Sequence, residues 1–149
     1  MTSSATAPAV TITPEAIKHL EFIQAVIARL GNGSFLIKGW TMTVAGVFFG
    51  VLVSRPGWLL ALAGLVPIGG FWLLDSYFLR QERLFRKLYD DVRKPGTNVE
   101  LFSMNVQPYD SAVSWTGVVR SHTMINFYGM LALIDLVFIG WGVVRAVTS

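Results

Sequence analysis

Long apolar segments alternate with shorter charged ones along the chain. Three apolar segments, residues 35–53, 58–78 and 125–144, reach the roughly 20 residues that a membrane-spanning helix needs. Residues 54–57 separate the first two segments and leave room only for a tight turn. The pattern predicts an all-α membrane protein with three transmembrane helices, the first two forming a helical hairpin.

The basic residues indicate how these helices are oriented. With a cytosolic N-terminus, ten of the 12 Lys and Arg residues lie in or beside the cytosolic segments. Arg55 and Arg145 fall on the outer side. Because Lys and Arg accumulate in cytoplasmic loops, we predict an N-in, C-out topology.

The segments before the first span have helical and non-helical parts. Residues 1–12 are small and mostly polar and are interpreted as a mobile tail. Thr13-Pro14-Glu15 has the features of a helix start. Apolar residues at four- and three-residue spacing then predict an amphipathic cytosolic helix over residues 13–31. The sequence "GNGS", residues 31–34, is predicted to end this helix before the span begins at residue 35.

The second transmembrane helix is predicted to continue into the cytosol. Residues 79–94 contain no Gly or Pro and carry an apolar stripe, so they extend the helix until Pro95-Gly96. We expect this stripe to pack against the first amphipathic helix or to bind a second subunit. Residues 95–124 are predicted to form a cytosolic loop with a short interfacial helix, for which docking of a soluble partner is the alternative. The residues proposed for such a partner surface are Leu84, Phe85, Leu88 and Trp115.

Polar side chains inside apolar spans are costly and usually face protein or water. Lys38 and Asp75 lie at similar depth on the two hairpin helices, so we predict an ion pair that fixes the hairpin register, with a transport role as the alternative. Asp135 lies near mid-depth of the third span, and no basic residue matches its depth. It either holds the bundle together, with Thr43 as a possible hydrogen-bond donor, or faces an oligomer axis or a water-filled path.

Small residues form a stripe on the first span. Gly39, Gly46 and Gly50 recur with Thr43 at four- and three-residue spacing, and Gly46 to Gly50 forms a GxxxG motif. Such stripes allow helices to approach closely, either within the hairpin or between subunits.

The composition limits the kinds of chemistry that the chain can carry out. The chain is 53% hydrophobic and 14% charged, against about 25% charged in soluble domains. It has no Cys, and its two His residues show no metal-ligand spacing, so we predict neither an enzyme nor a metal or cofactor site. The basic residues between 80 and 94 are explained by topology and anionic headgroups, so no nucleic-acid partner is expected.

Several strings resemble one family. They are "NGSFLIKGWTMTVAG", "FWLLDSYFLRQERLFRKLYDDVR", "FSMNVQPYD" and the "FYG" that enters the last span. They are similar to uncharacterised small bacterial integral membrane proteins with NSFLIKGW and LDxYxLxxERLFRxLY motifs. This chain departs from the first motif at Gly33, where Asn is expected. The resemblance implies a bacterial inner-membrane location. Because such proteins are often encoded in defence-like gene neighbourhoods, it also implies an anti-phage or toxin-like effector role.

Three functional hypotheses follow. The first is a non-enzymatic, homo-oligomeric membrane effector that perturbs the lipid bilayer or forms a pore. The second is a membrane anchor or scaffold that recruits a soluble cytosolic protein. The third, a transporter, is disfavoured because three spans without an internal repeat are too few unless several subunits assemble.

Overall fold

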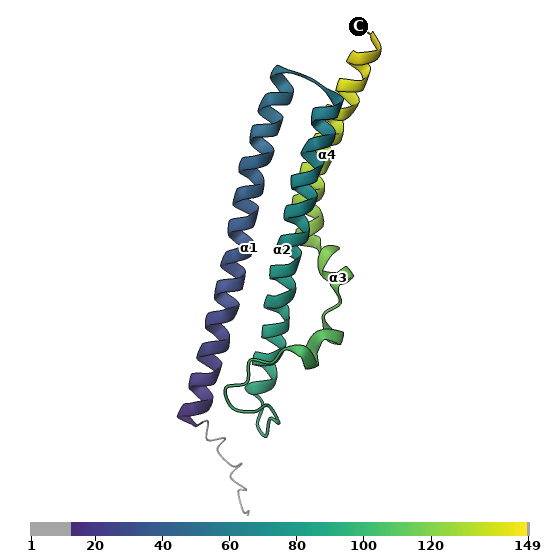
Figure 1. Cartoon of the computed structure of the whole chain (residues 1–149). Helices are drawn as coiled ribbons and strands as arrows, with labels where there is room; N and C mark the ends of the chain where they lie inside the picture. Colours follow the sequence, from purple (N-terminus) through teal and green to yellow (C-terminus); the bar gives the residue numbers. More distant parts are fainter. Residues whose placement is uncertain (1–12, 149) are drawn as a thin grey trace, which may run out of the picture.

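The computed structural model describes residues 13–148, and all of their regular structure is helical. Three long helices, α1 (Pro14–Ser54), α2 (Trp58–Val92) and α4 (His122–Thr148), run side by side (Figure 1). The short helices η1 (Gln107–Ala112) and α3 (Trp115–Val119) lie in the connection between α2 and α4. Each long helix is long and apolar enough to cross a membrane, and each contains one of the three predicted spans. The predicted tail, residues 1–12, lies outside the described residues.

α1 is one helix of 41 residues, so the predicted break at residues 31–34 is wrong. The predicted start is confirmed, because the Thr13 hydroxyl accepts the backbone N–H of Ala16 at 3.2 Å. A Cβ on Gly33 would lie 2.7 Å from the Phe78 ring, so this glycine allows α1 and α2 to approach closely. Packing along α2 therefore outweighs the low helix propensity of the two glycines, each of which costs about 1 kcal/mol relative to Ala.

α2 is also continuous, as predicted, from the hairpin turn through residues 79–92. Pro67 lies inside it without ending it. The helix ends at Val92, just before Pro95 and Gly96, and Gly96 adopts a φ of +69° that suits glycine.

α2 is the central helix of the molecule. It packs against α1 along one side and against α4 along another, whereas α1 and α4 have fewer contacts with each other, among them the stacked Phe49 and Phe138 rings, whose centroids are 5.6 Å apart. The hairpin turn and the C-terminus lie at one end of the molecule, and the start of α1 and the α2–α4 connection lie at the other (Figure 1). We call the latter the open end.

A second core occupies the open end, apart from the apolar core that α1, α2 and α4 form between the spans. Ile23 of α1 is buried against Leu88 and Val92 of α2, so the predicted packing of the two apolar stripes is confirmed. Leu84 is buried separately with Val113 and Val118, next to α3.

The predicted partner surface therefore needs correction. Leu84 and Leu88 each expose only 1% of their surface, and Phe85 packs at the edge of the second core. These side chains are covered by the chain itself because α1 and the α2–α4 connection close over the extension of α2. Trp115 alone of the four remains well exposed, at 41%.

The α2–α4 connection is tied to α2 by polar contacts. The Trp72 indole N–H donates to the carbonyl of Val119 at 3.1 Å, and Arg80 donates to the carbonyl of Val113 and to the Asp110 carboxylate. Ser114 caps α3 by accepting the N–H of Gly117. The predicted short helix is present, but it is only one turn long and is held against α2.

Candidate functional site

A polar cluster joins the three long helices at the boundary of the predicted spans. Lys38 Nζ lies 2.5 Å from Asp75 Oδ2, so the predicted ion pair is present. The Ser34 hydroxyl donates to the other carboxylate oxygen, and the Tyr128 hydroxyl donates to Oδ2 at 3.0 Å. Asp75 and Tyr128 are fully buried.

This cluster is built by helix geometry. Ser34 and Lys38 are one turn apart on α1, and Lys38 Nζ also donates to the Ser34 hydroxyl at 2.9 Å. Tyr128 comes from α4 and stacks on Trp72 of α2, with ring centroids 5.9 Å apart. Asp75 therefore accepts hydrogen bonds from two neighbouring helices at once, which fixes the register of α1 and α4 against α2.

Asp135 is buried in a different setting. Its side chain packs over Gly64 of α2, where an added Cβ would lie 3.1 Å from Oδ1. Both carboxyl oxygens are buried and without a hydrogen-bond partner among the described residues. The predicted bond from Thr43 is not formed, because Thr43 is exposed and donates to the carbonyl of Gly39 at 3.1 Å. Asp135 thus faces α2 within the bundle and not the outer surface of the helices.

The predicted small-residue stripe points away from the rest of the chain. A Cβ on Gly39, Gly46 or Gly50 would meet nothing within 4 Å. Close packing uses other glycines, notably Gly64 against Asp135 and Gly142 against the Trp58 backbone. The stripe therefore does not serve the hairpin, and of the two predicted uses only contact between subunits stays open.

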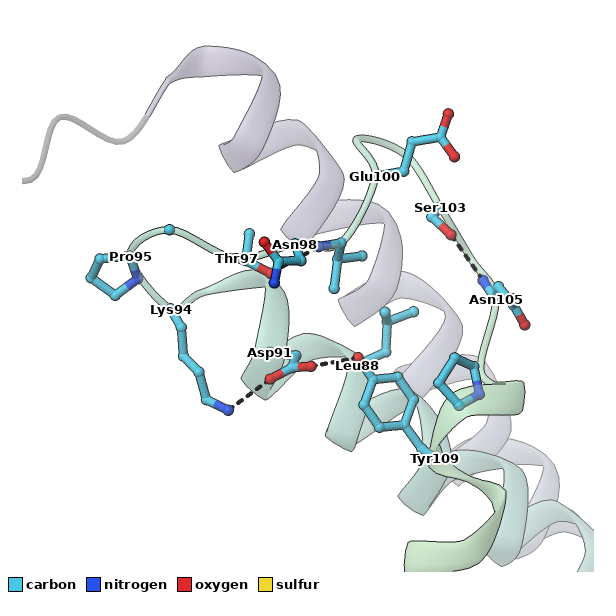
Figure 2. Close-up of a pocket in the computed structure, with 13 residues that line it drawn as sticks. Leu88, Asp91, Lys94, Pro95, Thr97, Asn98, Glu100, Ser103, Asn105 and Tyr109 are labelled. Atoms are coloured by element: carbon cyan, nitrogen blue, oxygen red, sulfur yellow. Dashed lines mark hydrogen bonds and ion pairs between the residues drawn. The ribbon is translucent and has the colours of Figure 1, made fainter.

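A polar pocket of about 500 Å³ lies at the open end, between the end of α2 and residues 94–109 (Figure 2). Within it Asp91 accepts hydrogen bonds from Lys94 at 2.7 Å and from the Tyr109 hydroxyl at 2.8 Å. These two bonds, the Lys94 one first, lower the pKa of Asp91. Burial, followed by the Asp91 bond, raises the pKa of Tyr109 to about 12. The negative charge of Asp91 is already balanced by Lys94, and its carboxylate already accepts two hydrogen bonds. We therefore assign Asp91, Lys94 and Tyr109 to holding the loop against α2.

Beside this pocket lies an exposed apolar surface, which we call the tip patch. It consists of Phe22 from α1 and Leu101, Phe102 and Met104 from the loop, each exposing 36% to 48% of its surface. The Phe22 and Phe102 rings lie 6.1 Å apart, centroid to centroid.

The backbone of the tip patch is held in an unusual conformation. Phe102 has a φ of +61°, a left-handed conformation that costs an ordinary residue about 1–2 kcal/mol. His19, buried on α1, lies with Nε2 2.9 Å from the carbonyl oxygen of Ser103 and packs its ring near Phe102. The loop is thus fixed to α1 in a way that presents Phe102 outwards.

The sequence did not single out Ser34, Tyr128 or the tip patch. Ser34 had a usable signal, since it precedes Lys38 by one helical turn. Tyr128 precedes Asp135 by seven residues and so shares its helix face. The tip patch had no signal in the sequence, because its loop residues meet α1 only through the tertiary fold.

Among residues 13–148 no group of three His, Cys, Asp or Glu side chains lies close enough to hold a metal ion. Comparison with known proteins found no family model, no curated protein and no solved structure that matches the chain. The three apolar helices define the class: a multi-pass, all-helical membrane protein. The resemblance to small bacterial membrane proteins stays a prediction, and the function has to be argued from the geometry.

Proposed function

We propose that this protein is a bacterial inner-membrane anchor whose open end lies in the cytosol and docks a soluble protein through the tip patch. The tip patch is the observation that carries the proposal. Exposed apolar side chains are normal where lipid covers a helix, but a cluster of them in water is typical of a protein-binding surface.

The position of the tip patch supports this proposal. Phe22 lies 13 residues before the first predicted span, which corresponds to about 20 Å along α1. The basic residues gather at the same end of the chain, so the positive-inside rule directs the tip patch to the cytosol. A cytosolic surface held this far from the predicted span is available to a soluble partner.

The two continuous helices suit an anchor. α1 and α2 pass without a break from the predicted spans into the open end, and the Lys38–Asp75 pair joins them at the boundary. The docking surface is therefore held rigidly relative to the bilayer.

The proposal is tested by photo-crosslinking in living cells. A photoreactive phenylalanine analogue placed at Phe22 should crosslink to one soluble protein, and that protein should leave the membrane fraction in a Phe22→Ser/Phe102→Ser variant. Trp115→Ser is the matched control, because Trp115 is equally exposed but lies outside the tip patch. Membrane recruitment that survives the double variant, or that Trp115→Ser abolishes instead, would refute docking at the tip patch.

The second candidate is the homo-oligomeric membrane effector, with the anti-phage role that the resemblance implies. The exposed glycines of α1 favour it, because a face of small residues lets a second copy approach closely in lipid. Induced expression should then depolarise the inner membrane, and Gly46→Ile should prevent this while Gly140→Ile, at an equally open site on α4, should not. Unchanged membrane potential on induction would count against the effector.

A further inference from the structure

A groove lies between α1 and α4 on the side of the bundle that α2 does not fill. The two helices touch at Phe49 and Phe138, and from that contact towards the open end they line a groove of about 630 Å³. Its apolar walls are formed by Met42, Phe127, Met130, Leu131 and Ile134.

The groove has the length of one leaflet. From Ile134 to His122 it follows 12 residues of α4, or about 18 Å, close to half of the roughly 30 Å hydrocarbon core. The residues that line the groove stop at Ile134, four residues before Phe138, whose ring stacks on Phe49 of α1. A transmembrane helix of another subunit needs a path through both leaflets, so this groove fits an occupant confined to one.

The groove also suits an acyl chain. Its walls are apolar and its volume is about 630 Å³, and an acyl chain is a slender apolar occupant that such walls would cover.

The end of the groove nearest the open end is polar. His122, Thr123 and Asn126 line it, and none of these side chains has a partner among residues 13–148. Arg120, exposed two residues before His122, is likewise without an ion pair in the described chain. A positive charge and several hydrogen-bond donors therefore stand at headgroup depth, next to the mouth of an apolar groove.

We propose that the groove between α1 and α4 binds one anionic phospholipid of the cytoplasmic leaflet. An acyl chain lies along Met42, Phe127 and Ile134, and the phosphate is held by the Thr123 hydroxyl, the Asn126 amide and Arg120. The proposal rests on the proposed N-in orientation for the choice of leaflet, but it does not depend on the tip patch.

Native mass spectrometry of the full chain, released from nanodiscs of equal phosphatidylglycerol and phosphatidylcholine, tests this site. The wild type should retain one lipid per chain, with phosphatidylglycerol favoured at least about fivefold. Ile134→Trp should fill the end of the groove nearest the Phe49–Phe138 contact and lose this lipid, whereas Leu133→Trp, one residue away on an exposed face, should keep it. Arg120→Gln should keep a lipid but lose the preference for phosphatidylglycerol.

Several outcomes would overturn the proposal. They are no retained lipid in the wild type, equal retention in the two Trp variants, and a lipid-free wild-type dimer that Ile134→Trp converts to monomer. Circular dichroism melting of both Trp variants shows whether a loss is due to unfolding, and if Ile134→Trp unfolds, Met42→Trp fills the groove from α1 instead. Phe22→Ser/Phe102→Ser should retain the lipid, so failure of the docking proposal and failure of the lipid site are separable.

Discussion

At the scale of single residues, two glycines of α4 stand in opposite environments. A Cβ on Gly142 would lie 2.7 Å from the backbone nitrogen of Trp58, whereas a Cβ on Gly140 would meet nothing within 4 Å. Gly142→Ala should therefore force α2 and α4 apart at the hairpin end and cost about 1–3 kcal/mol of unfolding free energy. Gly140→Ala should be neutral or stabilising by up to about 1 kcal/mol, because Ala favours the helix.

Unfolding of both variants in detergent, followed by circular dichroism, measures the difference. Equal stability of the two would show that α4 does not pack against the start of α2 as described.

Tyr109 gives a pH-dependent prediction. Its pKa is raised from 10.0 to about 12 by burial and by the bond to Asp91, so its contribution to stability is complete below pH 10 and is lost as the pH rises towards 12. The ultraviolet absorbance of tyrosinate, taken as wild type minus Tyr109→Phe, should titrate near 12. A midpoint near 10 would mean that the hydroxyl is free in solution.

The partner carboxylate responds at the opposite end of the pH range. The pKa of Asp91 is lowered, so its contribution is present above about pH 4 and is lost on acidification. The loop should thus be held most firmly between these limits, because both members of the pair are then in the protonation states that the hydrogen bond requires.

At the scale of elements, the register of α1 against α2 depends on Asp75. Lys38→Met would leave the buried carboxylate with two hydroxyl donors and no counter-charge, which should cost about 1–3 kcal/mol of unfolding free energy. Adding Asp75→Asn should recover part of the loss, since the neutral amide no longer needs the lysine. The same detergent unfolding assay measures both variants, and a single variant as stable as the wild type would reduce the pair to an incidental contact.

The elements also show what could be predicted from the sequence. Hydrophobic length and period gave the three spans, the unbroken α2 and the packing of Ile23 on Leu88, because each depends on which face of a helix is apolar. Lys38 and Asp75 lie at matching depth along the hairpin, and this depth was enough to predict their ion pair.

Other features depended on contacts that no local pattern records. "GNGS" has the composition of a helix stop, but the Phe78 ring packs over Gly33 and the carboxylate of Asp75 accepts from Ser34, so α1 continues. The sequence alone predicts Leu84 and Leu88 as part of a partner surface, but the connection to α4 covers both side chains in the fold. The tip patch requires His19 to meet a loop more than 80 residues away.

At the scale of the whole molecule, the described chain has two distinct surroundings. Beside the spans its exposed side chains are apolar and suit lipid, and the proposed lipid groove opens there. At the open end the surface is mainly polar, with the tip patch as an apolar interruption. Both proposed sites depend on which side of the membrane the open end occupies, so topology is the property to measure first.

The chain has no cysteine, so a single introduced thiol reports its own location. Thr97→Cys places a thiol on the exposed loop of the open end, and Ser54→Cys places one at the exposed hairpin turn. With an N-in topology, a membrane-impermeant maleimide should label Ser54→Cys in spheroplasts and should label Thr97→Cys only after lysis. Lysed samples of both variants are the control for reactivity. Labelling of Thr97→Cys in sealed spheroplasts would place the tip patch outside the cell, which would overturn cytosolic docking while leaving the helical fold unaffected.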